Sequence, residues 1–317
     1  MVAQLASVII PSFNGAHLLP ACLDSLAKQT YPNVEVIVAD GASTDRTHEL
    51  LAGGYPNVRL IALQRNLGFT GNVNAGLRAA RGDVLCLLNN DAQADVDWVA
   101  ACVESLASHP DVGSVASKVL YADGGRINSA GDLLCRNGSP QQRGNGQLDG
   151  SQWDVRAFVF GASGGAAAYR TEMLQDVGLL DEHFFMYLED VDLAFRAQLR
   201  GWSCCYEPSA RVTHLGGASG GGKLESFYNG RNLIRLWAKN LPGGLVRRML
   251  PAILQYQSQR ARDALAAWRG AAARATLRGQ LVGLAELPRH LADRPPIQRG
   301  RRISDETLYA LLSPVPA

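Results

Sequence analysis

Short apolar runs alternate with segments of helical periodicity through the first 120 residues of the chain. The apolar runs are rich in Val, Ile and Leu and have the length of strands buried on both faces. They predict strands at Ala6–Pro11, Val34–Ala39, Val58–Leu63, Val84–Leu88 and Val112–Val119. The segments between them predict helices at His17–Gln29, Thr44–Ala52, Gly71–Ala80 and Val96–Ser108. This order is typical of a parallel sheet with crossover helices, which binds ligands where its strands end.

The pattern changes after Tyr121. Predicted hairpins, an extended run and a helix that ends at Arg200 come first, with the hairpins at Ala122–Gly150 and the run at Val155–Tyr169. Two strands, a glycine-rich loop and a helix follow at Ser203–Tyr206, Arg211–His214, Gly216–Gly222 and Glu225–Lys239. Pro242-Gly243-Gly244 then predicts a boundary. We therefore expect one domain over 1–240, with halves at 1–120 and 121–240, and a helical extension over 241–317.

Charge is distributed unevenly along the chain. The net charge is +2, yet between Leu241 and Arg302 twelve arginines stand against three acidic residues. A basic extension on an acidic body predicts an anionic partner. Arginines interleaved with Leu and Ala fit an amphipathic helix on an anionic membrane surface, and a solvated helix or a dimer interface is the alternative. Nucleic acid is a poorer fit, because no nucleic-acid motif accompanies the charge.

Other features narrow the class of protein. The 317 residues contain no run of about 18 apolar residues. The N-terminus lacks a basic region before its short apolar segment, so we expect a cytoplasmic protein without a signal peptide. The six cysteines form no C-x-x-C pair, which argues against a disulfide framework or a zinc site.

Three carboxylates directly follow an apolar, aromatic run within the segment Asp181–Arg196. They are Glu189, Asp190 and Asp192. One interpretation is a helix start, with Asp190 as N-cap and Asp192 paired with Arg196 four residues later. The other is a general base, because an apolar surface raises a carboxyl pKa while a nearby cation lowers it. This segment alone leaves both interpretations open.

Polar side chains stand where the predicted strands end. Pro11-Ser-Phe-Asn-Gly15 follows the first strand and lacks the G-x-G-x-x-G pattern of dehydrogenases. After the second strand, Asp40 offers a carboxylate for a nucleoside or for helix capping. After the fourth, Asn89-Asn90-Asp91 offers oxygen ligands for Mg²⁺ or Mn²⁺, with a simple Asx turn as the alternative.

Four segments in this order, Val8–Asn14, Val36–Asp45, Arg65–Gly76 and Leu87–Asp91, resemble glycosyltransferase family 2. Two later segments, Phe184–Arg200 and Pro208–Gly216, are similar to its rhamnosyltransferase-like branch. The resemblance covers roughly residues 5 to 240 and not the arginine-rich extension. It implies an α/β fold with one Rossmann-like domain of the glycosyltransferase A type and a mainly parallel sheet. It also implies an enzyme that binds a nucleotide-diphosphate sugar and inverts its anomeric carbon.

The resemblance also assigns roles to single residues. Asp40 matches a nucleoside-binding aspartate, and Asp190 matches the catalytic base. Asp91 and His214 match metal ligands. Because Asn89 stands at the first position of the family's D-x-D motif, Asp91 is expected to carry most of the ligation. Glu189 is expected to be a neighbour that positions the base or the acceptor.

Further candidates lie in the loops around these residues. Donor contacts are predicted for Pro11, Ser12, Asn14, Ser43, Arg65, Asn66, Asn90 and Arg231. Acceptor contacts are predicted for Gly164, Gly165 and Glu189. The alternatives are a solvated loop for Arg65 and Asn66, a bulged strand for the glycines, and a helix surface for Arg231.

The expected activity is metal-dependent transfer of a sugar, with inversion, to a saccharide or lipid-linked saccharide acceptor. The setting implied is bacterial cell-surface polysaccharide synthesis, with the enzyme in the cytoplasm or at the inner face of the membrane. dTDP-L-rhamnose is the leading donor. The alternatives are a galactofuranosyl or hexosyl transferase that uses a UDP-sugar, and a nucleotide-sugar-binding module without catalysis. Asp91, Asp190 and His214 together argue against the last, because a binding module needs no base.

Overall fold

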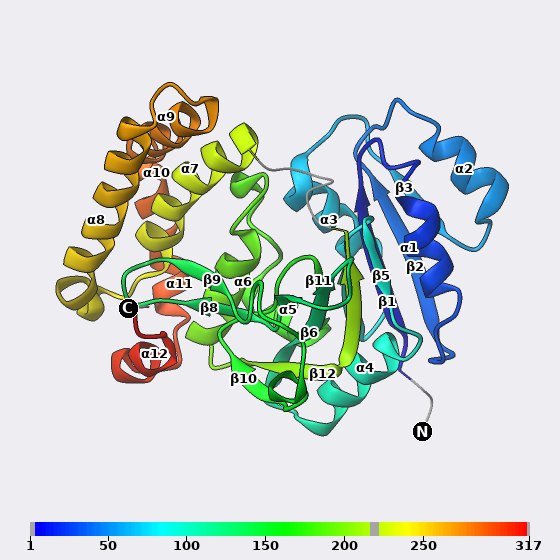
Figure 1. Cartoon of the computed structure of the whole chain (residues 1–317). Helices are drawn as coiled ribbons and strands as arrows, with labels where there is room; N and C mark the ends of the chain where they lie inside the picture. The colour runs from blue at the N-terminus through cyan, green and yellow to red at the C-terminus, as the bar shows by residue number, and fades with distance from the viewer. Residues whose placement is uncertain (1–3, 216–221, 316–317) are drawn as a thin grey trace.

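The computed structural model describes residues 4–215 and 222–315. Its N-terminal half alternates strands and helices as the apolar pattern predicts (Figure 1). The strands are β1 (Ala6–Ser12), β2 (Val34–Asp40), β3 (Arg59–Ala62), β4 (Val84–Leu88) and β6 (Val112–Tyr121). The helices are α1 (Leu19–Leu26), α2 (Thr47–Gly54), α3 (Gly68–Ala79) and α4 (Trp98–Ser108). All five predicted strands and four predicted helices are confirmed, and a short strand, β5 (Ala92–Ala94), is added.

The region from residue 122 to residue 240 combines short strands with three helices. Its strands are β7 (Ile127–Ser129), β8 (Asp132–Leu134), β9 (Pro140–Gln142), β10 (Ala157–Val159), β11 (Ala166–Arg170) and β12 (Ser203–His214). Its helices are α5 (Thr171–Val177), α6 (Glu189–Leu199) and α7 (Gly222–Asn240), with 3₁₀ turns at Ser151–Trp153 and Glu182–Phe184. The two strands predicted around residues 203–214 are one strand with an irregularity after Glu207. The predicted glycine-rich loop, apart from Gly222, lies outside the described residues.

One mixed sheet carries the fold, with the main strand order β10-β12-β6-β11-β4-β1-β2-β3. The pairs β1–β2, β2–β3, β1–β4 and β6–β12 are parallel. Strand β11 runs antiparallel between β4 and β6. Because β2 and β4 flank β1 on opposite sides, the strand order reverses direction at β1, and a crevice is expected at the carboxyl ends of these strands. The sequence residues after β1, β2 and β4 therefore meet at one edge of the sheet.

Apolar side chains fill both faces of the sheet. One cluster joins alternate residues of β1, such as Val8 and Ile10, to helices α1 and α4, where Trp98 is fully buried. The other joins Ile9 of β1 to Val73 of α3 and to helices α5 and α6. The period-two alternation along β1 thus places the sheet between two helical layers.

Helix α6 begins at Glu189, two residues before the start that a cap at Asp190 would require. Leu188 is the N-cap and has a left-handed conformation with φ of 69°. Asp190 lies in the first turn, so the prediction that it caps the helix is wrong. The prediction that Asp192 pairs with Arg196 is confirmed by an Oδ2–Nε distance of 2.9 Å.

The arginine-rich extension is helical and gathers beside α7, far from β1–β3 (Figure 1). Its helices are α8 (Gly243–Ala266), α9 (Ala271–Ala285), α10 (Leu287–Ala292), α11 (Arg294–Arg299) and α12 (Asp305–Leu311). Leu245, Met249 and Leu308 share one apolar cluster with Phe184 and Phe195 of the preceding region. The extension therefore completes the core that supports α6. Within the described residues, no helix has the length and apolarity needed to cross a membrane.

Candidate active site

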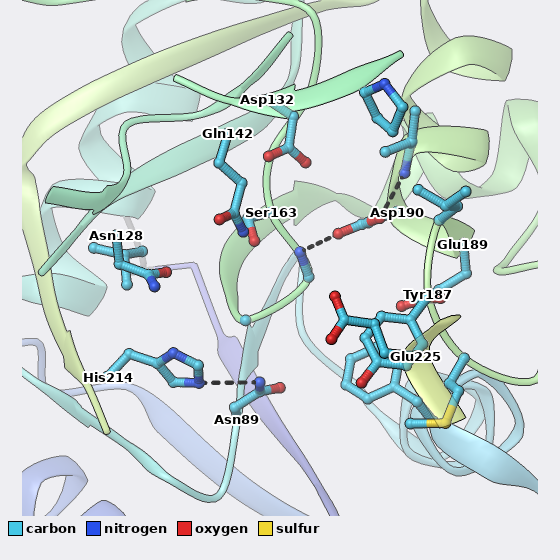
Figure 2. A pocket seen from close by; sticks show the side chains of 18 of the residues that line it. Asn89, Asn128, Asp132, Gln142, Ser163, Tyr187, Glu189, Asp190, His214 and Glu225 are labelled. Carbon is cyan, nitrogen blue, oxygen red and sulfur yellow. Dashed lines mark hydrogen bonds between the residues drawn. The ribbon is translucent and has the colours of Figure 1, made fainter. Parts of the chain in front are cut away.

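A cleft of about 420 Å³ opens where β4 and β12 end and α6 begins. Figure 2 shows His214 and Asn89 on one wall and Asp190 and Glu189 on the opposite wall. Polar residues from several elements line it: Asn89, Asp91, Asn128, Asp132, Gln142, Ser163, Glu189, Asp190, His214, Glu225 and Asn229. The structure thus brings the predicted base, Asp190, into one cavity with both predicted metal ligands, Asp91 and His214, which lie 123 residues apart in the sequence.

Asp91 and His214 meet on the first wall. The His214 Nε2 atom lies 2.9 Å from the Asp91 Oδ1 atom, and 3.5 Å from the Asn89 amide nitrogen. Pairing of β12 with β5 places His214 beside Ala92, directly after Asp91. The buried Oδ1 atom of Asn89 and Nδ1 atom of His214 have no hydrogen-bond partner among the described residues. A carboxylate, an amide oxygen and an imidazole are a donor set that Mg²⁺ or Mn²⁺ accepts, so these residues fit a divalent cation.

The Asp190 carboxylate is fixed on the second wall by backbone groups. Gly164 N donates to its Oδ2 atom and Val191 N to its Oδ1 atom, both at 2.8 Å. Burial raises the pKa of Asp190, and the hydrogen bonds from Gly164 and Val191 oppose that rise. A Cβ atom at Gly164 would lie 3.3 Å from Oδ2, tighter than most such contacts. A small residue there lets the backbone reach the carboxylate.

Glu189 is more deeply buried than its neighbour. Its Oε2 atom has no hydrogen-bond partner among the described residues. Burial raises the pKa of Glu189 well above its usual range, and the charge of Asp190 raises it further. Glu189 therefore favours its protonated form in a range where an ordinary carboxyl is ionised.

A strained turn immediately precedes these two acids. Phe185, Tyr187 and Leu188 have φ values of 64°, 66° and 69°, a region that side chains other than glycine seldom occupy. The buried Asn232 of α7 holds the turn, because its Nδ2 atom donates to the carbonyl oxygens of Phe184, Met186 and Tyr187 at 2.8–3.0 Å. Backbone strain of this kind persists only where surrounding contacts enforce it. Asn232 is thus a residue that orients the acidic wall, and sequence reasoning missed it.

Asp192 has a structural environment. It is fully buried and accepts hydrogen bonds from Arg196, Lys239 and Asn240. Burial raises the pKa of Asp192, but the Lys239 and Arg196 charges outweigh this and hold the pKa below its usual range. The Asp192 carboxylate therefore joins α6 to α7 within the core.

The predicted donor residues after β1 and β2 form a second group. Ser43 links them, since its Oγ atom accepts from Asn14 N at 2.7 Å and lies 2.5 Å from Asp40 Oδ1. The buried Asp40 also accepts from Ser43 N and pairs with His48 at 2.8 Å. Asn14 and Ala42 have positive φ values in these loops. The structure thus shows Asp40 ordering the loop, and its contact with a nucleoside stays a prediction.

The remaining donor candidates differ in their placement. Pro11 and Ser12 are buried at the end of β1, and the Ser12 Oγ atom has no hydrogen-bond partner among the described residues. Asn90 adjoins them, because a Cβ atom at Gly15 would touch both Ser12 and Asn90. In the loop after β3, Arg65 is exposed, while the Asn66 Oδ1 atom accepts from Gly68 N at the start of α3.

The structure does not place Arg231 among the residues that line the cleft. Its Nε atom donates to Glu286 of the extension at 2.8 Å, and its Nη1 atom to the carbonyl oxygen of His183. Arg231 therefore attaches the extension to the turn that precedes α6. The predicted acceptor residues Gly164 and Gly165 do line the cleft.

A second acidic group lies outside the cleft, where Asp181, His183 and Asp293 bring ligand atoms within 4.8 Å of one another. Cationic side chains already occupy it. Arg235 pairs with Asp181 at 2.5 Å and with Asp293 at 2.8 Å, and Lys239 also pairs with Asp181. This group therefore serves as an ion-pair network between α7 and the extension.

Known proteins are similar to this chain in sequence and in fold. Residues 7–178 match the family Glycosyl transferase family 2. An N-acetylglucosaminyl-diphospho-decaprenol L-rhamnosyltransferase of Mycobacterium tuberculosis is 31% identical over 250 residues, which cover 68% of this chain and 76% of that protein. The mannosyltransferase PcManGT of Pyrobaculum calidifontis, solved with GDP-Man and Mn²⁺, superposes with a TM-score of 0.58 at 20% identity, covering 98% of this chain and 84% of that one.

GalNAc-T7, solved with UDP, GalNAc and Mn²⁺, superposes with a TM-score of 0.59 at 18% identity. That match covers 75% of this chain and 48% of GalNAc-T7. The two solved structures confirm the glycosyltransferase A type fold, and the sequence matches establish the activity class. The chain belongs to glycosyl transferase family 2 and is a glycosyltransferase that uses a nucleotide sugar.

Proposed function

We propose that this chain transfers a sugar with inversion and that Asp190 is the general base. The observation that carries the proposal is the Asp190 carboxylate, fixed by two backbone N–H groups on one wall of the cleft. His214 lies on the opposite wall (Figure 2), and Asp91 is 2.9 Å from its Nε2 atom. Direct displacement at an anomeric carbon needs a base on the side of the acceptor hydroxyl, away from the departing diphosphate. In this cleft the proposed base and the proposed metal ligands likewise lie on opposite walls.

Asp190 accepts the proton of the acceptor hydroxyl as its oxygen bonds to the anomeric carbon and the bond to the diphosphate breaks. Burial raises the pKa of Asp190, which makes it a stronger base than an exposed aspartate. Its two backbone hydrogen bonds leave lone pairs on both oxygens for the hydroxyl. Glu189, with its higher pKa, positions the acceptor or the base and takes no proton from it.

Asp91 and His214 are the residues that would hold Mg²⁺ or Mn²⁺, with the Asn89 amide oxygen beside them. Two unpartnered buried atoms, Asn89 Oδ1 and His214 Nδ1, support a ligand at this wall. A bound divalent cation neutralises the charge of a diphosphate leaving group. The residues after β1 and β2 then hold the nucleotide, with Asn14, Asp40 and Ser43 at the nearest strand ends.

dTDP-L-rhamnose is the donor that we propose, and a lipid-linked saccharide of bacterial cell-surface polysaccharide synthesis is the acceptor. The support is the mycobacterial relative, whose name specifies an L-rhamnosyltransferase and an N-acetylglucosaminyl-diphospho-decaprenol. Calorimetric titration with dTDP-rhamnose, UDP-galactose, UDP-galactofuranose and GDP-mannose, each with Mn²⁺, Mg²⁺ or EDTA, tests both donor and cation. If only a UDP-sugar binds, dTDP-rhamnose is not the donor. If EDTA leaves donor binding unchanged, the proposed role of the cation in donor binding is wrong.

The substitution Asp190→Asn tests the base. We expect donor binding to be retained and transfer to fall by about 10²–10⁴-fold, the usual contribution of a positioned base. Asp123→Asn is the control, because it removes one carboxylate from an exposed position outside the cleft. Transfer by Asp190→Asn at the wild-type rate removes Asp190 from the reaction.

The extension is proposed to contact an anionic membrane surface. Of its twelve arginines up to residue 302, only Arg301 and Arg302 pair with a carboxylate among the described residues. Leucines of α8–α10 and Arg294 line an open apolar hollow of about 710 Å³, with Leu254 56% and Leu281 68% exposed. Flotation with phosphatidylglycerol and phosphatidylcholine vesicles tests this. The full chain should float with the former only, and Leu254→Ser/Leu281→Ser should weaken binding; equal flotation with both lipids contradicts the proposal.

A further inference from the structure

Asp132 is a buried carboxyl group that no protein side chain or backbone group satisfies within the described residues. Its residue is 5% exposed, and its side chain makes no hydrogen bond or ion pair among the described residues. Its carboxyl projects into the cleft, as Figure 2 shows. Such a group at the wall of a binding cleft is suited to a ligand that supplies the missing hydrogen bonds.

The backbone of Asp132 is tied to the loop that holds the proposed base. Asp132 N donates to the carbonyl oxygen of Gly161 at 2.8 Å, and Gly161 N donates back at 3.3 Å. Three residues later, Gly164 N donates to the Asp190 carboxylate. Strand β8 and the start of α6 are therefore fixed relative to each other through this glycine loop. A ligand held by Asp132 has a defined position relative to Asp190.

Asp132 is surrounded by acidic groups: the carboxyls of Asp190 and Glu189, the Tyr169 hydroxyl and the Cys204 thiol. Burial raises the pKa of Asp132 well above its usual range, and Asp190 raises it further. Asp132 in turn raises the pKa values of Glu189, Tyr169 and Cys204. Among the described residues, the carboxyls of this wall do not bring three ligand atoms within 4.8 Å, so they form no metal cluster. A carboxyl group accepts a hydrogen bond from a hydroxyl group when ionised and also donates one when protonated, so either form matches a hydroxyl group.

We infer that Asp132 binds a second hydroxyl group of the acceptor sugar and so selects which hydroxyl reaches Asp190. This inference rests on the proposed transfer. Asn128, Gln142 and Ser163 line the same part of the cleft and match a ligand rich in hydroxyl groups. A site that hydrogen-bonds a substrate hydroxyl discriminates strongly against an analogue that lacks it, because the buried partner is then left unsatisfied. Asp132 is thus a determinant of acceptor specificity and of linkage position.

The test combines variants of Asp132 with a series of acceptors. Octyl N-acetyl-β-glucosaminide and its monodeoxy derivatives serve as acceptors, with kcat/KM and the linkage of the product measured for each. One deoxy derivative should lower the wild-type kcat/KM by at least about tenfold. The same derivative should lower the kcat/KM of Asp132→Ala by less than about twofold, because this variant already lacks the partner of the missing hydroxyl. Asp132→Ala should also yield a second linkage isomer, while Asp132→Asn keeps part of the selectivity.

Equal losses in the wild type and in Asp132→Ala for every deoxy derivative overturn the inference. Thermal unfolding of the substrate-free proteins gives a readout that needs no turnover. At about pH 8, Asp132→Asn should melt at or above the wild-type temperature, because a carboxyl of raised pKa loses stability as pH rises through its unfolded-state pKa. A clearly lower melting temperature assigns Asp132 a structural role and also overturns the inference. Absence of transfer by the wild type to any acceptor would instead contradict the proposed function.

Discussion

Asn232 should control activity through the strained turn that precedes Asp190. Its amide carries two N–H hydrogens, shared among three carbonyl oxygens at 2.8–3.0 Å, and the residue is fully buried. Asn232→Ala removes these donors and leaves the carbonyls of Phe184, Met186 and Tyr187 without them. With about 1–3 kcal/mol for each unsatisfied buried group, and some carbonyls regaining water, we expect a loss of about 2–4 kcal/mol in the free energy of unfolding. The turn, once released, should relax from its positive φ values.

Asn240 provides a matched control on the same helix. It is also fully buried, and its Nδ2 atom donates to Asp192 at 2.7 Å and to the carbonyl oxygen of Leu236 at 3.0 Å. Asn240→Ala should lose a similar free energy of unfolding without touching the strained turn. Urea unfolding gives the stabilities, and kcat/KM is measured at a temperature where both variants are folded. Asn232→Ala should lose at least about tenfold in kcat/KM, equivalent to 1.4 kcal/mol, while Asn240→Ala stays within about twofold.

Equal losses of activity in the two variants would refute the reasoning, because activity would then follow stability and not the turn. A wild-type rate for Asn232→Ala at a reduced stability would show that the turn keeps its shape without the amide. Either result removes Asn232 from the positioning of Asp190.

Two further predictions concern buried charge. Glu189→Gln should match the wild type in stability below about pH 4, where the carboxyl is protonated in both states, and exceed it at higher pH. The raised pKa of Glu189 costs the folded wild type about 1.4 kcal/mol for each pH unit between the unfolded and folded pKa values. Urea unfolding across pH checks this, and a constant difference contradicts it. Lys239→Met removes one of the cations that pair with Asp181 and the buried Asp192, while Arg235 and Arg196 stay in place. It should therefore lower the free energy of unfolding by up to about 3 kcal/mol, the lower end of the range for a broken buried pair. Lys28→Met, at an exposed position, should change it little; similar melting temperatures for both variants would contradict the role of the network.

The sequence predicts the sheet well because its strands carry local signals. Continuous Val, Ile and Leu runs identify β1 to β4, and the polar residues directly after β4 identify one loop that lines the cleft. Asn232 and Asp132 carry no such signal, since each looks like an ordinary polar residue in a helix or a hairpin. Their importance comes from long-range contacts, with Asn232 meeting a turn 45 to 48 residues away. Arg231 shows the converse. An arginine suits a phosphate group, but in the fold this side chain forms an ion pair with Glu286.

The acids Glu189, Asp190 and Asp192 show why residue type alone does not assign roles. All three lie in the first turn of α6, where any of them would favour the helix dipole. Asp192 faces Lys239 and Arg196 and is held ionised within the core. Glu189 faces neither cation nor donor at its Oε2 atom, so it favours its protonated form. Asp190 is the one of the three that is held at the cleft by two backbone N–H donors. Burial raises its pKa and so makes it a stronger base, while the two hydrogen bonds stabilise its ionised form. Because successive helical residues point about 100° apart, the carboxyls at positions 189, 190 and 192 face different surroundings. One is the proposed base, one favours its protonated form, and one is a structural anion.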